Sequence, residues 1–192
     1  MCAAFREQIR YERELDDAKT RLAQNPEFNL MDAWQMIDRN TKGYVTGPEI
    51  IDALACYGIY PHKHDVYLFV RRFDRDSDGR LVYSDFCEAF TPIDKEISHC
   101  LSSRQSTYSK QGFCKNSYFQ PQTKEMFLRT LKLHFTIEES SELMRKRLSR
   151  RPNFNAHTAF SHLDAKQIGY LILEDLRQFF ADNQYVCSDT EL

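Results

Sequence analysis

Apolar residues recur at helical spacing on both sides of a polar loop at residues 74–85. The apolar positions before the loop are Val66, Phe69, Val70 and Phe73, and those after it are Phe86, Ala89, Phe90 and Ile93. Spacings of three and four residues place each set on one face of a helix. The pattern therefore predicts two helices, each with one buried face, joined by the loop.

A second pattern is an internal repeat, found when the chain is compared with itself at an offset of 126 positions. The ungapped matches pair Arg21-Leu22 with Arg147-Leu148, Pro26 with Pro152, Phe28-Asn29 with Phe154-Asn155, Ala33 with Ala159, Asp38 with Asp164, and Gly43-Tyr44 with Gly169-Tyr170. A charged helix opens each copy, with apolar stripes at Tyr11, Leu15, Ala18 and Leu22 and at Ile137, Met144 and Leu148. Thr136 and Glu139 are spaced as a capping box, which predicts the start of the second helix.

The composition is globular, with 42% hydrophobic and 28% charged residues among 192, and the formal net charge is −2. That charge provides no global field for nucleic acid or an anionic membrane, so neither is expected as a partner. The six cysteines include no Cys-x-x-Cys pair, and the N-terminus lacks the apolar core of a secretion signal. No apolar run reaches the roughly 18 residues of a membrane helix. A cytoplasmic protein with reduced thiols is expected.

Residues 97–123 contain no acidic residue and are rich in Ser and Gln. They predict a polar linker between an N-terminal domain at 1–96 and a C-terminal domain at 124–192. The linker also carries Arg104, Lys110 and Lys115 among the aromatic residues Tyr108, Phe113, Tyr118 and Phe119. Two interpretations stay open, a flexible tether or a strap whose aromatics dock on another surface.

Residues 74–85 read Asp-Arg-Asp-Ser-Asp-Gly-Arg-Leu-Val-Tyr-Ser-Asp, an alternation of oxygen ligands with glycine at the sixth position. A hard divalent cation needs six or seven oxygens at roughly 2.4 Å. The predicted ligands are the carboxylates of Asp74, Asp76 and Asp78, the carbonyl of Arg80 and the carboxylate of Asp85. Gly79 permits the sharp turn that a Cβ would obstruct. The loop therefore predicts one metal site.

This loop and its flanks resemble the EF-hand superfamily, the helix-loop-helix modules of calmodulin, troponin C and centrin. The same frame fits at Asp38 and at Asp164, each with apolar residues at helical spacing on both sides. The resemblance covers about residues 28–94 and 154–181. It implies an all-α fold with an EF-hand pair lobe, followed by a C-terminal helical region with a single degenerate EF-hand, and Ca²⁺ as the cofactor.

Ligand chemistry survives in one of the three loops. The loop at 38–49 has Lys42 where the third acid should be, and charges about 4 Å apart interact by roughly 4 kcal/mol at an effective dielectric of 20. The loop at 164–175 has Lys166 and Ile168 at its third and fifth positions, and isoleucine offers no oxygen. Neither loop is expected to hold Ca²⁺.

The loop at 74–85 also departs from the family pattern. Asp85 is one methylene shorter than the usual glutamate, and Arg75 and Arg80 reduce the field of the four acids. The site is therefore expected to be weak for Ca²⁺ or to lean toward Mg²⁺. Two outcomes stay open, useful Ca²⁺ binding or a structural loop that is empty or holds Mg²⁺.

No enzyme is expected, because the chain has no nucleophile elbow, phosphate-binding glycine loop or zinc-protease motif. His62-Lys63-His64 lacks further ligands at zinc spacing and predicts an inter-helix turn. Residues 144–151 hold five cations. They fit either a solvated helix end or a contact with an acidic surface, such as a nucleic-acid backbone or an acidic protein tail.

EF-hands pair because the short strand in each loop leaves backbone groups that a second loop satisfies. Loops 38–49 and 74–85 are expected to pair, with the N-terminal helix packed against them. The third hand has no mate, and its apolar set comprises Phe160, Leu163, Leu176, Phe179 and Phe180. Its expected cover is another protein, a second copy of the chain, or the helix at about 137–149 with the linker.

Two functions compete for this chain. One is a structural adaptor docked in a larger assembly, and the other is a calcium-sensing regulator that opens its N-terminal lobe to bind a target helix. Two loops without ligands favour the adaptor. The order of charged helix, Pro-x-Phe-Asn, EF-hand pair and residues 85–92 also resembles EF-hand proteins of ciliary and flagellar axonemes. That resemblance implies an axonemal location with tubulin or other axonemal proteins as partners, and the basic residues 145–151 suit acidic tubulin.

Overall fold

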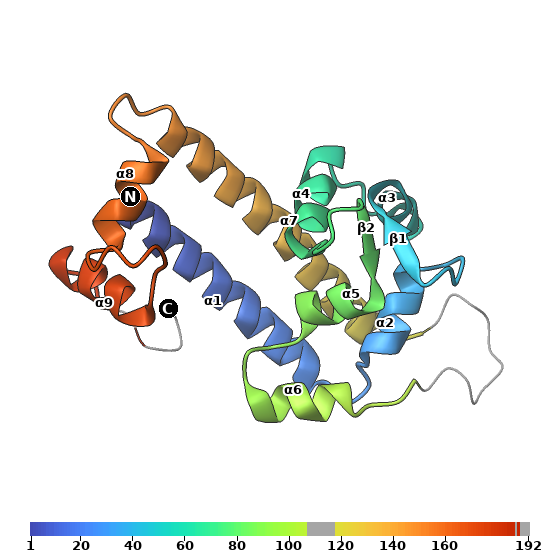
Figure 1. Cartoon of the computed structure of the whole chain (residues 1–192). Coiled ribbons are helices and arrows are strands. Elements are labelled where there is room, and N and C mark those ends of the chain that lie inside the picture. Colours follow the sequence, from blue (N-terminus) through green and yellow to red (C-terminus); the bar gives the residue numbers. More distant parts are fainter. Residues whose placement is uncertain (107–117, 187, 189–192) are drawn as a thin grey trace. The chain divides into compact units, whose positions relative to one another are not determined.

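The structure is a computed structural model that describes residues 1–106, 118–186 and 188 (Figure 1). Its helices are α1 Cys2–Gln24, α2 Leu30–Ile37, α3 Gly47–Ala55, α4 Lys63–Phe73, α5 Tyr83–Phe90, α6 Lys95–Ser102, α7 Pro121–Ser149, α8 Ala156–Leu163 and α9 Leu173–Asp182. The strands of the described residues are β1 Tyr44–Thr46 and β2 Arg80–Val82. The predicted all-α fold class is confirmed. None of the described helices combines the length and the apolar character needed to span a membrane.

The chain divides into two compact units. The third-hand unit comprises Met1–Glu14 and Ser140–Leu192, and the paired-hand unit comprises Leu15–Glu139. These units differ from the expected division into 1–96, 97–123 and 124–192. The reason is the length of α1 and α7, which have 23 and 29 residues and therefore contribute to both units.

The paired-hand unit contains the two EF-hands that were expected to pair. Helix α2 begins after Asn29, whose side chain accepts the backbone N–H of Asp32 at 2.8 Å. The strands β1 and β2 are antiparallel, with Val45 opposite Leu81. Both of these side chains are buried. The ribbon thus joins the two loops through their eighth positions, and α2 to α5 surround it (Figure 1).

Helix α7 begins at Pro121, fifteen residues before the predicted capping box. Proline suits a first helical position because its missing N–H has no partner there in any helix. The carboxylate of Glu27 accepts the backbone N–H of Gln120 at 2.6 Å and the hydroxyl of Thr123. Thr136 lies inside the helix, where its Oγ1 donates to the carbonyl of Lys132 at 3.2 Å. The predicted start at Thr136 is therefore wrong.

The described ends of the predicted linker pack on the paired-hand unit. Asp94 accepts the backbone N–H groups of Glu96 and Ile97 and thereby begins α6, which the polar composition had not predicted. Arg104 Nη1 donates to the carbonyls of Asn25 and Phe28, at 2.7 Å in both cases. The strap interpretation thus holds for Phe119, which is buried in the core of its own chain. Tyr108, Lys110, Phe113 and Lys115 lie outside the described residues.

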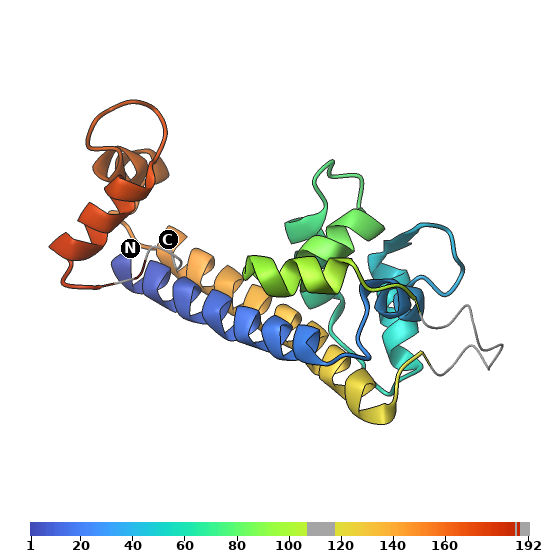
Figure 2. The same cartoon turned by 90° about the horizontal axis from the view of Figure 1, so that it is seen from below.

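The third-hand unit buries its apolar face against the N-terminus of α1. Its core residues Leu163, Phe179 and Phe180 pack with Met1, Cys2, Phe5, Ile9, Leu171 and Tyr185. The Phe5 ring lies edge-on to Phe179 and Phe180, with centroid distances of 6.0 and 6.2 Å. Residues 170–172, where an unpaired strand was expected, form no strand. Helix α1 therefore provides cover that none of the three expected alternatives included (Figure 2).

Candidate metal centre

All three EF-hand loops share one backbone conformation, whether or not they carry metal ligands. The fourth position of each loop has a left-handed φ, 51° at Thr41, 58° at Ser77 and 54° at Gln167. The sixth position is a glycine with a φ of 83°, 80° and 83° at Gly43, Gly79 and Gly169, respectively. A Cβ at these glycines would meet no atom within 4 Å. The backbone dihedral, rather than crowding, is therefore what favours glycine there.

The first acid of each loop holds this conformation by accepting two backbone N–H groups. The pairs are Asp38 with Lys42 and Gly43 at 3.0 and 2.8 Å, Asp74 with Asp78 and Gly79 at 3.3 and 2.8 Å, and Asp164 with Ile168 and Gly169 at 3.0 and 2.8 Å. The sequence had indicated a ligand role for Asp74 but no structural role for any of the three acids. The sequence did contain a sign of this structural role, because an aspartate stands at the first position even of the two loops that lack other ligands.

The acid at the twelfth position has a similar structural role. Its carboxylate accepts the backbone N–H of the ninth position, from Thr46 to Glu49 at 3.0 Å, from Val82 to Asp85 at 3.1 Å and from Ile172 to Asp175 at 3.0 Å. Each bond satisfies a donor at the start of the exit helix. The third and fifth positions are therefore the ones that distinguish a metal loop from a purely structural one.

The loop at 74–85 brings three of the predicted ligands together. Ligand oxygens of Asp74, Asp76 and Asp78 all lie within 4.8 Å of one another, and Asp85 is not part of this group. Arg80 lies 3.7 Å from Asp78 in an ion pair, and its guanidinium also stacks on the Tyr44 ring at 4.6 Å. Three converging carboxylates on a loop of EF-hand conformation fit a divalent cation.

The closeness of the carboxylates changes the pKa values of Asp74 and Asp76. Desolvation alone would raise the pKa of Asp74. Hydrogen bonds from the backbone N–H of Gly79 and from the side chain of Asp76 outweigh it, so the pKa of Asp74 is lowered. The pKa of Asp76 is raised by its hydrogen bond with Asp74 and by the charge of Asp78. A bound cation is the natural counter-charge for such a cluster.

The loop at 38–49 contains its own cation. The Lys42 ammonium pairs with the carboxylate of Glu49 and lies 4.5 Å from the centroid of the Tyr44 ring. The hydrogen bond between them raises the pKa of Lys42 and lowers the pKa of Glu49. Lys42 thus supplies a positive charge to the acid that would otherwise complete a metal site.

The loop at 164–175 has no ligand oxygen at its third or fifth side chain, because these positions are Lys166 and Ile168. The acids at its first and twelfth positions, Asp164 and Asp175, are buried and accept backbone N–H groups. These hydrogen bonds match those of the other two loops and hold the EF-hand conformation of this loop.

Helix α7 fills the apolar face of the paired hands. Phe127 and Leu131 are completely buried, and Phe135 is 5% exposed. The Phe127 ring lies 5.2 Å from Phe90, and the Phe135 ring lies 5.5 Å from Phe69. Spacing by four residues puts all three side chains on one face of α7. Figure 2 shows the first turns of this helix beside the paired hands.

Two polar contacts fix the ends of this buried stretch. Glu27 binds Gln120 and Thr123 at the beginning, and Arg72 forms an ion pair with Glu138 at the end. The Glu138 side chain is only 5% exposed. Sequence reasoning assigned no role to α7 in the first lobe, although the spacing of Phe127, Leu131 and Phe135 was a visible signal.

Comparisons with known proteins agree with this geometry. The model for an EF-hand domain pair matches residues 27–91. Troponin C, isoform 1, of Balanus nubilus is 25% identical over 115 residues, covering 57% of this chain and 71% of that protein. The probable calcium-binding protein CML29 of Oryza sativa subsp. japonica is 33% identical over 60 residues, covering 31% and 35%. EF-hand calcium-binding domain-containing protein 7 of Xenopus laevis is 28% identical over 81 residues, covering 42% of this chain and only 13% of that protein.

Two helix-loop-helix modules joined by a short antiparallel ribbon, with converging carboxylates in one loop, define a divalent-cation-binding class of protein. The chain belongs to the EF-hand superfamily, as the first resemblance implied. Membership implies Ca²⁺ binding, and the acidic loop with Asp74, Asp76 and Asp78 is able to hold an ion.

Proposed function

We propose that this protein is an EF-hand structural adaptor docked in a larger assembly, with its paired hands held in one conformation by their own helix α7. The observation that carries the proposal is the complete burial of Phe127 and Leu131 in the core of the paired-hand unit. A calcium sensor must offer this kind of surface to a target helix. Here the surface is already occupied.

Release of α7 would be costly. Burying a side chain of the size of Phe or Leu contributes roughly 1.5–3 kcal/mol. Three such residues of α7 lie in the core, and the Arg72–Glu138 ion pair would also be separated. Leaving Glu138 without its partner in a nearly buried position adds a further penalty. The cost disfavours opening by one weak metal site.

The alternative is a calcium-sensing regulator that opens its paired hands to bind a target helix. One observation favours it, the convergence of Asp74, Asp76 and Asp78 in a loop of EF-hand conformation. The proposed adaptor has this single site at most, filled by Ca²⁺ or Mg²⁺. Nothing in its role requires catalysis.

The two functions differ in how much apolar surface Ca²⁺ exposes. We expect binding of an environment-sensitive dye such as ANS to change little when millimolar Ca²⁺ is added to the wild type. The double variant Phe127→Ala, Phe135→Ala is the positive control, because its groove is emptied and should bind dye without Ca²⁺. Circular dichroism checks that both proteins stay helical. A large Ca²⁺-dependent dye signal in the wild type would contradict the adaptor.

The assembly we propose is the ciliary or flagellar axoneme, with tubulin or other microtubule-bound proteins as partners. Support comes from the axonemal resemblance of the sequence and from the basic residues 145–151, whose charge suits acidic tubulin. We expect the third-hand unit to provide the contact, since Phe160 and Leu173 remain 38% and 41% exposed there. Imaging of a tagged protein in a ciliated cell tests the location, and a purely diffuse cytoplasmic signal would exclude it.

A further inference from the structure

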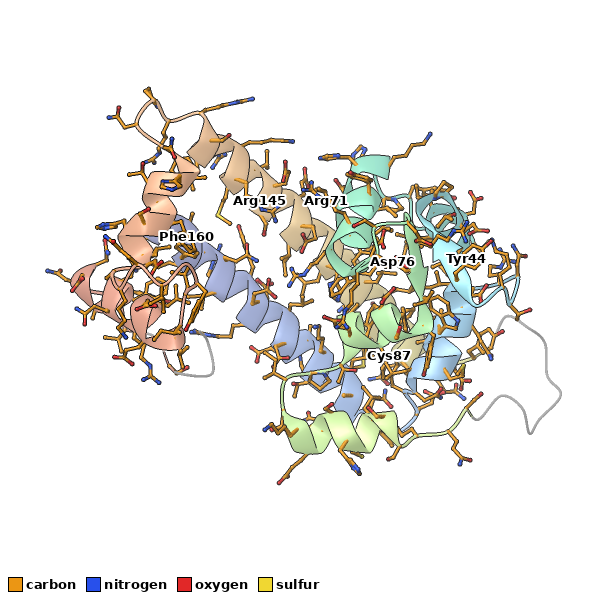
Figure 3. All side chains as sticks on the ribbon, in the orientation of Figure 1. Tyr44, Arg71, Asp76, Cys87, Arg145 and Phe160 are labelled. Atoms are coloured by element: carbon orange, nitrogen blue, oxygen red, sulfur yellow. The ribbon has the colours of Figure 1, made fainter. Side chains whose placement is uncertain are left out.

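We propose that residues 145–151 form a docking site for an acidic polypeptide segment. This basic segment comprises the last turns of α7 and the start of the connection to α8 (Figure 3, in which Arg145 is labelled). The inference rests on the proposed adaptor function and deepens it, because it states which charges of the segment are available to a partner and what kind of polymer they fit.

The basic segment is short of counter-charge. Its cations are Arg145, Lys146, Arg147, Arg150 and Arg151, and all five are exposed. Glu142 accepts a hydrogen bond from Arg145 at 2.9 Å and also lies 3.6 Å from Lys146. Within the described part of the chain, Arg147, Arg150 and Arg151 have no acidic partner. Three of the five cations are therefore available to an acidic partner.

The helix end accounts for only some of these charges. Cations in the last turn of a helix interact favourably with its carbonyl groups, and this applies to Lys146 and Arg147. Helix α7 ends at Ser149, so Arg150 and Arg151 lie beyond the turn where that effect acts. Between residues 143 and 173 there are six Lys or Arg and one acid, Asp164, which is buried and bonded to its own loop. A solvated helix end does not require such an excess.

The small extent of the positively charged surface favours a short acidic peptide over a nucleic acid. The third-hand unit as a whole has ten Lys or Arg and ten Asp or Glu, so its positive charge is local. The segment has five helical residues and two beyond the helix, so it spans at most about 14 Å, which matches roughly four residues of an extended peptide. Leu143, 47% exposed and one turn before Arg147, adds an apolar contact that a phosphate backbone would not use.

The test uses the full chain and a fluorescein-labelled peptide of eight glutamates, with binding followed by anisotropy at low salt. We expect the double variant Arg150→Glu, Arg151→Glu to bind at least about tenfold more weakly than wild type. Arg129→Glu, Lys132→Glu is the matched control, because it makes the same charge change at exposed positions of the same helix, and we expect a change below about twofold. Added salt should weaken wild-type binding.

Three outcomes would overturn the docking site. These are no peptide binding by the wild type at low salt, equal losses in the two double variants, or tighter binding of an eight-nucleotide single-stranded DNA than of the peptide. The dye experiment on the paired hands reads a different unit. A protein that keeps its groove closed but ignores the peptide would therefore leave the adaptor standing and remove only this site.

Discussion

At the scale of single residues, the loops separate two roles that an acidic side chain can have. Asp164 and Asp175 hold the conformation of a loop that lacks ligand side chains at its third and fifth positions, through the same backbone bonds that Asp74 and Asp85 make. Asp76 and Asp78 make the difference, since they add carboxylates that converge on one point. Among the described residues, these two positions therefore distinguish the candidate metal loop from the other two loops.

Removing Asp78 should abolish the metal site while the loop survives. In the variant Asp78→Ala the group of three carboxylates is reduced to two, too few to replace the water around Ca²⁺. Calorimetric titration of wild type and variant with Ca²⁺ and with Mg²⁺ measures the effect, and Asp17→Ala is a control that removes an exposed charge elsewhere. Equal heats in wild type and Asp78→Ala would place the ion at another position.

Replacing Lys42 should create a site in the first loop. Lys42→Asp removes the ammonium that pairs with Glu49 and adds a carboxylate to a loop that already has Asp38 and Asn40. We expect the variant to bind one more Ca²⁺ per chain than wild type in the same titration. An unchanged stoichiometry would show that Lys42 is not what prevents binding.

The third loop should depend on Asp164 although no metal is expected there. Asp164→Ala leaves the N–H groups of Ile168 and Gly169 without their acceptor, a loss of about 1–3 kcal/mol in local stability. Hydrogen exchange of residues 156–182 measures this loss of stability, and we expect faster exchange in Asp164→Ala than in wild type. Lys166→Ala is the control at an exposed position. Protection that stays the same in Asp164→Ala would mean that other contacts hold the loop.

At the scale of elements, α7 supplies both the cover of the paired hands and a buried histidine. His134 lies among the rings of Phe69, Phe73 and Phe90, with centroid distances of 5.2, 5.5 and 5.2 Å. Neither ring nitrogen makes a hydrogen bond of normal geometry to a described residue. Burial, with the nearby charges of Lys19 and Arg72, holds the pKa of His134 well below its usual value, and an interaction with the backbone of Ala89 only weakly opposes this.

The packing of α7 should therefore weaken in acid. A depressed pKa means that the unfolded chain binds a proton that the folded chain does not, so His134 lowers stability as the pH falls below about 6.5. The slope from this residue reaches at most about 1.4 kcal/mol per pH unit. Urea unfolding between pH 7.5 and pH 5 should be less pH-dependent in His134→Phe than in wild type. An identical dependence would assign the effect to other groups.

The elements differ in how far the sequence could predict them. The hands were readable because their loops combine fixed spacing, a glycine and helical apolar stripes within about thirty residues. The start of α7 could not be predicted in this way, because Glu27, which accepts the N–H of Gln120 there, lies 93 positions away in the sequence. Thr136 and Glu139 instead have the local spacing of a capping box, which predicted the wrong start. The cover on Phe179 was missed for the same reason, because Phe5 and Ile9 are far away in sequence.

At the scale of the whole molecule, one chain combines paired hands whose groove is filled and a third hand covered by the chain's own N-terminus. In both cases a long helix of the same chain covers the apolar surface that an EF-hand can offer to a partner. We therefore propose that a partner contacts the surfaces that these helices leave exposed, including the basic segment and the third-hand residues Phe160 and Leu173. This organisation favours permanent attachment over a response to Ca²⁺.

The shared helices also affect how the protein can be dissected. The third-hand unit is built from Met1–Glu14 together with Ser140–Leu192, so it is not a continuous stretch of chain. An expression product that starts near residue 140 would lack Phe5 and Ile9 and would present Phe179 and Phe180 to solvent. Aggregation of such a product would reflect the cut rather than the native surface. A circular permutant that joins Leu192 to Met1 keeps this unit in one piece.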